Sequence, residues 1–169
     1  MPAVLFYILS AVMLAAALLV VLQTHPVYSV VFAIISFVSL AGLFLILGAE
    51  FIAAAQIIVY TGAIMVLFLF VIMLLNLRRE DIEERGVSLM KTAGSIGTLV
   101  LLGLLGGVLA GKISLGPQGP FSQEVIRQAG NTQAVGRALF TDFLFPFEAT
   151  SVLIFVALVG VVILAKKKL

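Results

Sequence analysis

Long runs of apolar residues, broken by short polar stretches, dominate the sequence. A membrane-spanning helix needs about 20 mostly apolar residues. Runs of this kind occupy about residues 3–22, 27–47, 51–75, 92–111 and 148–165. Turn-forming residues lie between them, such as Pro26 before the second run and Gly48 before the third. The pattern therefore predicts one all-α integral membrane domain over residues 1–169, with five transmembrane helices.

The composition supports a chain that is solvated by lipid. Hydrophobic residues make up 63% of the sequence and charged residues only 11%, whereas about 25% of residues are charged in an ordinary soluble domain. Before Arg78, the only acidic or basic side chain besides His25 is that of Glu50. Soluble classes are thereby nearly excluded. The net charge of +2 comes largely from the three lysines at residues 166–168, too local a patch for binding nucleic acid.

The distribution of Lys and Arg predicts the orientation. With five spans, the loop at residues 78–91 and the C-terminus share one side, which has seven of the ten Lys and Arg residues. The other side, with the N-terminus and the loop at residues 112–147, has three. Because cytoplasmic loops carry the excess of Lys and Arg, we expect the N-terminus outside and the C-terminus inside.

Catalysis by this chain alone is not expected. The sequence has no Cys and one His, which excludes thiolate metal sites, cysteine-ligated iron–sulfur clusters and multi-histidine sites built from this chain. No nucleophile–base pair and no phosphate-binding glycine loop is present. We therefore predict no catalytic, cofactor-binding or metal-ligating residue.

Polar and small residues in the third run are the first candidates for a functional site. Gln56, Tyr60 and Ala63 have spacings that place them on one face of an α-helix. Gln and Tyr side chains can simply hydrogen-bond to a neighbouring helix, so helix packing and a functional role both remain open. Gly62 costs about 1 kcal/mol relative to Ala inside a helix. It indicates either close packing or a local irregularity such as a π-bulge.

The other candidates lie in the fourth run and near the ends of the spans. Gly103, Gly107 and Gly111 have the GxxxG spacing of close helix packing in lipid. Glu50 and Glu148 are expected at the starts of the third and fifth spans, where the helix dipole favours a carboxylate. They are also candidates for a peripheral proton relay. No acid, Lys or Arg lies near the middle of any span, so this chain lacks a complete transmembrane relay.

The long outer loop, residues 112–147, has a weak helical signal. Thr132 is placed to cap a short amphipathic helix in which Val135, Leu139 and Phe143 recur at helical spacing. Four phenylalanines gather near Pro146, at positions 140, 143, 145 and 147. They fit an interfacial aromatic belt or a contact with a partner.

The second and third runs closely resemble a known family. The match is strongest over residues 25–85 and most specific over Gln56–Asn76, QIIVYTGAIMVLFLFVIMLLN. Other matching segments are His25–Ser29, Ala41–Phe44, Leu47–Phe51, Ala134–Gly136 and Leu139–Phe140, with Glu148 opening the last run. The chain resembles subunit J of bacterial NADH-quinone oxidoreductase, the counterpart of mitochondrial NADH dehydrogenase subunit 6.

This resemblance implies a place in the membrane arm of respiratory complex I, beside subunit K and near the quinone-site subunit. It implies that NADH, FMN, the iron–sulfur clusters and quinone are bound by partner subunits. It also implies that the third helix can contain a π-bulge near Tyr60, Gly62 and Ala63, which can relax to regular α-helix. Thr61 stands where many relatives have alanine.

We interpret the chain as a non-catalytic, multi-pass subunit of a proton-translocating NADH:quinone oxidoreductase in the bacterial inner membrane. Its third helix is expected to help couple quinone reduction to proton transfer, with Gln56, Tyr60, Gly62 and Ala63 as coupling residues. An alternative is a membrane component of a multisubunit cation/proton antiporter. A third interpretation is a structural or assembly membrane protein with no role in transport.

Overall fold

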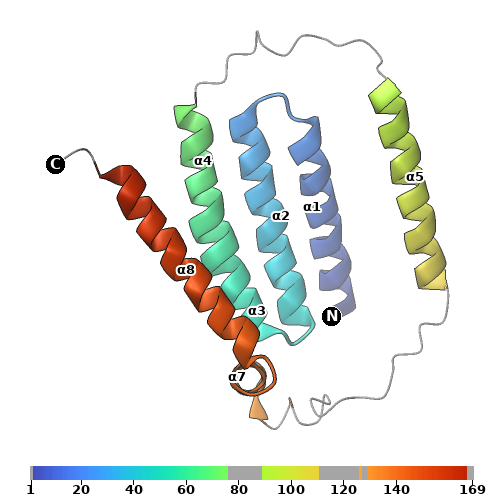
Figure 1. Cartoon of the computed structure of the whole chain (residues 1–169). Coiled ribbons are helices and arrows are strands. Elements are labelled where there is room, and N and C mark those ends of the chain that lie inside the picture. Colours follow the sequence, from blue (N-terminus) through green and yellow to red (C-terminus); the bar gives the residue numbers. More distant parts are fainter. Residues whose placement is uncertain (1, 76–88, 111–125, 127–128, 167–169) are drawn as a thin grey trace. The chain divides into compact units, whose positions relative to one another are not determined.

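The computed structural model describes residues 2–75, 89–110, 126 and 129–166, and within these ranges the secondary structure is helical, with no strand. The elements are α1 (Pro2–Leu22), α2 (Pro26–Ile46), α3 (Glu50–Ala55), η1 (Gln56–Ile64), α4 (Met65–Leu74), α5 (Leu89–Ala110), α7 (Asn131–Phe140) and α8 (Leu144–Ala165) (Figure 1). α3, η1 and α4 follow one another directly and form one long helix. The all-α prediction is confirmed for the described residues.

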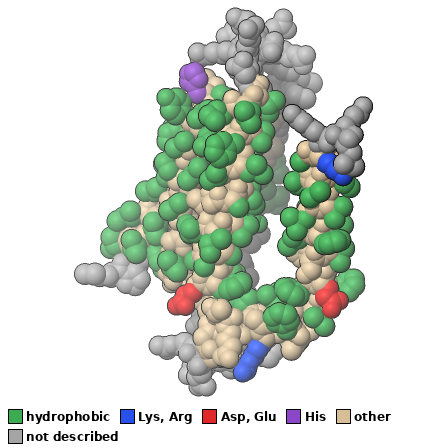
Figure 2. Space-filling view, turned by 90° about the vertical axis from the view of Figure 1, so that its left-hand side faces the viewer, with side chains coloured by type: hydrophobic (Ala, Val, Ile, Leu, Met, Phe, Trp, Pro, Cys, Tyr) green, Lys and Arg blue, Asp and Glu red, His purple; other side chains and the backbone are tan. Residues whose placement is uncertain are grey.

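Four helices are long and apolar enough to cross a membrane. Within the ranges that the structure describes, they are Ala3–Leu22, Pro26–Ile46, Glu50–Leu74 and Leu144–Ala165. Hydrophobic side chains cover most of the helical surface in Figure 2, and the acidic side chains visible on that face lie towards helix ends. α5 covers most of the fourth predicted run and begins at Leu89, three residues before the expected start. The count of five spans stays a prediction.

The chain divides into two compact units. One unit comprises Met1–Met73 with Phe121–Leu169, and the other comprises Leu74–Pro120 and contains α5. The first unit has a small core of mainly short side chains: Ala16, Val30, Ala41, Leu43, Ala53 and Ala134. Most of its large apolar side chains are exposed within the single chain. Lipid or the helices of partner subunits must cover them in a membrane.

α1 and α2 pack closely because a glycine lies at their interface. A Cβ atom added to Gly42 would lie 2.8 Å from Leu9 Cδ1. The Ser36 hydroxyl of α2 donates a hydrogen bond to the Met13 carbonyl of α1 at 3.3 Å. A small residue and an interhelical hydrogen bond are the usual means by which helices associate in lipid.

We predict that Gly42→Val lowers the amount of assembled protein in membranes, because the added carbons overlap the Leu9 side chain. Overpacking of this kind costs about 1–3 kcal/mol. Leu9→Ala in the same chain should restore much of the loss, since it removes the overlapping atoms. Gly160→Val on α8 is the control, because nothing in the described residues lies within 4 Å of its Cβ position. Quantitative immunoblotting of membranes measures the effect, and equal amounts of all four proteins would contradict it.

A tight turn joins α2 to the third membrane helix. Gly48 has a φ of +74°, which glycine adopts at little cost. The Gly48 N–H donates to the Leu45 carbonyl at 3.0 Å, and the Ala49 N–H donates to the Phe44 carbonyl at 2.9 Å. These two bonds form a Schellman motif, which ends α2 and satisfies its last carbonyls. The turn brings α3 and η1 back along α2, with which both are in contact.

The expected outer loop contains α7, although its start differs from the prediction. Thr132 lies inside α7, and Gly130, with a φ of +86°, occupies the N-cap position. The prediction of Thr132 as the cap is therefore wrong. Phe143 precedes α8 and lies outside α7. The rings of Phe140 and Phe147 meet edge-on with centroids 4.9 Å apart, which joins the end of α7 to the first turns of α8.

α8 begins at Leu144, four residues before the expected start of the fifth span. Pro146 lies in the first turn of α8, where proline is tolerated because its missing N–H needs no partner. Glu148 consequently lies one turn inside the helix, beyond the region where the helix dipole acts strongly. Its expected position at the helix start is therefore wrong, and its side chain is exposed.

Candidate functional site

The third membrane helix changes its hydrogen-bond register in the middle. The six residues of α3 are α-helical, the nine residues of η1 are π-helical, and α4 continues as an α-helix. A π-helix pairs each N–H with the carbonyl five residues earlier, in place of four. The Met65 N–H, which donates to the Tyr60 carbonyl, has this spacing. Because π-helical turns are rare and concentrate at functional sites, η1 is the candidate site.

Gly62 lies where a side chain would approach the backbone of η1. A Cβ atom added there would be 3.2 Å from the Ile57 carbonyl oxygen, five residues earlier. This is tighter than ordinary contact, and a backbone oxygen cannot swing aside as a side chain can. No other described atom outside the adjacent turns lies within 4 Å of that position. Within this chain, Gly62 is therefore explained by the local irregularity and not by close packing against another helix.

The Thr61 hydroxyl also follows the π register. It donates to the Gln56 carbonyl at 3.1 Å, five residues earlier. Hydroxyls in the described α-helices make the corresponding bond to the carbonyl four residues earlier, as at Ser39, Thr98, Thr150 and Ser151. Thr61 thus adds a side-chain hydrogen bond to the π turn, a structural role that the sequence alone did not indicate.

η1 is in contact with α2, and Tyr60 is the predicted residue that takes part in this contact. Gln56 is only 7% exposed, and Ser39 on α2 is the other buried polar residue in the described chain. The ring of Tyr60 meets Phe37 of α2 edge-on, with centroids 6.1 Å apart and an interplanar angle of 72°. Tyr60 is nevertheless 49% exposed, and Ala63 is exposed. The prediction that Gln56, Tyr60 and Ala63 share a face assumed α-helical spacing, which a π-helix does not have.

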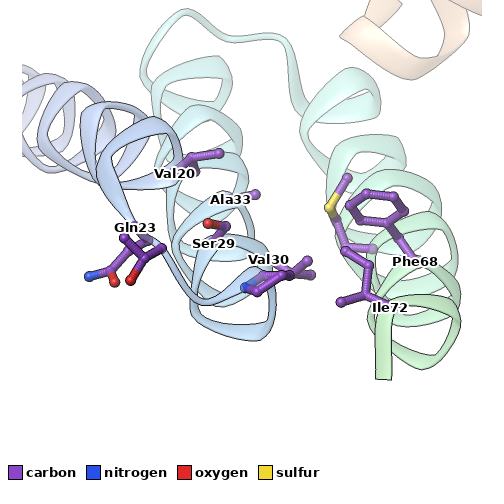
Figure 3. Close-up of a pocket in the computed structure, with 10 residues that line it drawn as sticks. Val20, Gln23, Ser29, Val30, Ala33, Phe68 and Ile72 are labelled. Atoms are coloured by element: carbon purple, nitrogen blue, oxygen red, sulfur yellow. The ribbon is translucent and has the colours of Figure 1, made fainter. Parts of the chain in front are cut away.

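α4 is held much less firmly than η1. It has no buried residue, whereas η1 has the buried Gln56 and is in contact with α2 and α3. A groove of about 330 Å³ separates one face of α4 from α1 and α2, and Figure 3 shows Phe68 and Ile72 across it from Val30. Met65, Phe68 and Ile72 line the α4 side of the groove, so a rotation of α4 would change its wall.

The beginning of α3, by contrast, is held from two sides. The Phe51 N–H donates to Asn131 Oδ1 of α7 at 3.1 Å. Ala53 and Ala134 are 3% and 6% exposed, and α3 contacts both α2 and α7. Glu50, the first residue of α3, is exposed and lines a groove of about 570 Å³ together with Gly130 and Asn131. Sequence reasoning missed Asn131, because its partner lies 80 residues away.

The structure describes two of the three glycines predicted to pack the fourth run. Gly103 and Gly107 lie on α5, and Gly111 lies outside the described residues. Their role in helix packing stays a prediction, as does a relay through Glu50 or Glu148. Within the described part of the chain, no group of three or more His, Cys, Asp or Glu residues is placed to hold a metal ion. The feature that distinguishes this site is therefore its π-helical hydrogen-bond register, and not a cluster of reactive side chains.

These features define a multi-pass helical membrane protein with a π-helical segment inside one span. Residues 16–164 match the family model of NADH-ubiquinone/plastoquinone oxidoreductase chain 6, and the chain belongs to this family. NADH-quinone oxidoreductase subunit J of Rickettsia felis is 34% identical over 163 residues, covering 96% of this chain and 80% of that protein. Subunit J of Rhodobacter capsulatus is 35% identical over 159 residues, covering 94% and 79%. NAD(P)H-quinone oxidoreductase chain 6 of Leptolyngbya boryana is 38% identical over 167 residues, covering 96% and 79%.

Proposed function

We propose that this chain is a membrane subunit of a proton-translocating NADH:quinone oxidoreductase, a translocase. The family match over residues 16–164 and the names of the similar proteins support the proposal. NADH, FMN, the iron–sulfur clusters and quinone bind to partner subunits, and this chain contributes no reacting group. The absence of Cys and the single His are consistent with that division. Its neighbours are subunit K and the quinone-site subunit.

The contribution of this chain is a switch in the third helix. The observation that carries this proposal is the π register of Gln56–Ile64 in the middle of an otherwise α-helical span. Conversion of η1 to an α-helix rotates the part of the helix after η1 relative to the part before it by about 100°. It also shifts that part along the helix axis by about 1.5 Å, and both values are those for one residue. Two registers of similar free energy form a bistable element, as long-range coupling requires.

The half that turns is α4. α3 and η1 are packed against α2, and α3 also contacts α7. Each of them has a buried residue and α4 has none, so turning α4 disturbs less buried structure. The rotation moves Met65, Phe68 and Ile72 away from their groove and brings other side chains of α4 to that position. Such a change makes or breaks a water path to a carboxylate of a partner subunit, since no acidic residue lies near the middle of this span.

Co-purification tests the function as a whole. A tagged chain, isolated in mild detergent, should carry flavin and iron–sulfur absorbance and should support NADH oxidation by quinone. Na⁺-dependent proton flux without NADH oxidation would instead favour the antiporter alternative. Neither activity, with the partners identified by mass spectrometry, would favour a purely structural protein.

The same proposal includes five spans in the bacterial inner membrane, with the N-terminus outside and the C-terminus inside. We predict that a reporter fused after Leu169 is active in the cytoplasm and that one inserted near Gly119 is active outside. The reason is the excess of Lys and Arg on the side of the C-terminus. Paired phosphatase and fluorescent-protein fusions measure the two sides. The opposite pattern would overturn both the charge argument and the predicted orientation.

A further inference from the structure

We propose that Asn131 is a positioning residue that holds the start of the third membrane helix, so that a register change in η1 moves α4 and not α3. The inference rests on the proposed function, because it assigns a fixed end to the switch described above. Asn131 lies outside the sequence segment that forms the switch, and it acts through a single hydrogen bond between α7 and α3.

The hydrogen bond is a helix cap supplied by a distant part of the chain. The first N–H groups of a helix have no partner within the helix, and a side-chain oxygen from the preceding residue usually accepts one of them. The residue before α3 is Ala49, which makes no side-chain cap. Asn131 Oδ1 accepts the Phe51 N–H instead, at 3.1 Å. Asn131 therefore supplies the cap that the residue before α3 does not provide.

The surroundings of Asn131 make this cap a fixed point. Ala53 on α3 and Ala134 on α7 are both buried, and small side chains allow the two helices to approach closely. At its other end, α7 is joined to α8 through the ring pair of Phe140 and Phe147. Asn131 is thus presented by a helix that packs on α3 and is itself attached to a membrane helix.

The distribution of burial then indicates which half of the third helix turns. α3 is capped by Asn131 and packed by α2 and α7, whereas α4 has no buried residue. A rotation of about 100° would break the cap and the packing of the buried Ala53 if α3 turned, and would move only partly or fully exposed side chains if α4 turned. Without the cap, part of the rotation is expected to be lost in α3, and the displacement of α4 is smaller.

The cap itself is tested by hydrogen–deuterium exchange in the assembled complex. Asn131→Ala should make the amide of Phe51 exchange about fivefold faster or more, as expected when a capped helix end becomes free to open. Asn131→Asp keeps an acceptor oxygen and should preserve the protection. Thr132→Ala changes the next residue of α7, which is exposed, and serves as the matched control. If Asn131→Ala does not assemble, Asn131→Ser, with its shorter side chain, takes its place.

The positioning role is tested by coupling in the same variants. Asn131→Ala should lower NADH-driven proton pumping about two- to fivefold per assembled complex, and Asn131→Asp should restore it. In a Gly62→Ala background, Asn131→Ala should have little further effect, because the two residues act on one element. A merely structural role for Asn131 would lower the amount of complex, leave its pumping per complex unchanged, and add independently to Gly62→Ala.

The outcomes separate this inference from the proposed function. Unchanged exchange at Phe51 in Asn131→Ala would overturn the cap. Faster exchange with unchanged pumping would overturn the positioning role and leave the switch in η1 standing. Normal pumping in an assembled Gly62→Val complex would overturn the switch itself, whatever the exchange at Phe51.

Discussion

Gly62→Val is expected to leave the complex assembled while lowering quinone reduction and proton pumping about tenfold or more. A Cβ atom at this position would lie 3.2 Å from the Ile57 carbonyl oxygen. Valine adds two further carbons and has a restricted χ1 angle in a helix. Overpacking of this kind costs about 1–3 kcal/mol, and about 1.4 kcal/mol changes a two-state ratio tenfold. The cost applies to the π register, so the variant favours the regular α-helix.

Graded variants separate this effect from a general loss of stability. Gly62→Ala adds only the Cβ atom and should lower pumping less than Gly62→Val. Gly160→Val introduces the same side chain in α8, where nothing described lies within 4 Å of the Cβ position, and should pump normally. NADH-driven proton uptake into membrane vesicles, divided by the amount of assembled complex, measures the effect. Parental pumping by an assembled Gly62→Val complex would show that Gly62 has no part in gating.

The helices that form the membrane domain were predictable because their pattern is set by lipid. The thickness of the bilayer requires about 20 mostly apolar residues in each spanning helix. The runs near residues 3–22 and 27–47 therefore agree with α1 and α2 within a residue. Helix ends were less predictable. The last span was expected to begin near Glu148, but α8 begins at Leu144, and Thr132 suggested a cap but lies inside α7.

The site itself was only partly visible in the sequence. Gly62 indicated an irregularity, but hydropathy cannot reveal a π register, because Ile, Val and Leu are equally apolar in both registers. Reading Gln56, Tyr60 and Ala63 with α-helical spacing consequently placed them on one face. The cap at Phe51 could not be predicted at all, since Asn131 is 80 residues away. Only the folded contact of α7 with α3 brings the two together.

Tyr60→Ala is expected to have the second-largest effect, a loss of about five- to tenfold in coupled turnover with near-normal assembly. The ring of Tyr60 meets Phe37 edge-on, and such aromatic pairs contribute about 0.5–1.5 kcal/mol beyond the area that they bury. This contact joins η1 to α2 within the π-helical segment, so its loss changes the balance between the two registers. Assembly is less affected because Tyr60 is 49% exposed within this chain and leaves no large cavity inside it.

Tyr60→Phe distinguishes the ring from the hydroxyl. It retains the contact with Phe37 and removes only the hydroxyl. An unpaired hydroxyl in an apolar environment costs about 1–3 kcal/mol on protein mutational scales. Its removal should therefore change turnover or the active/resting balance less than Tyr60→Ala does.

Tyr28→Ala is the control. It removes an exposed ring that meets only His25 among the described aromatic pairs. Steady-state turnover and the lag after resting incubation measure both quantities, and parental values in Tyr60→Ala would reduce Tyr60 to a packing residue. If Tyr60→Phe alone is normal, the ring acts and the hydroxyl does not.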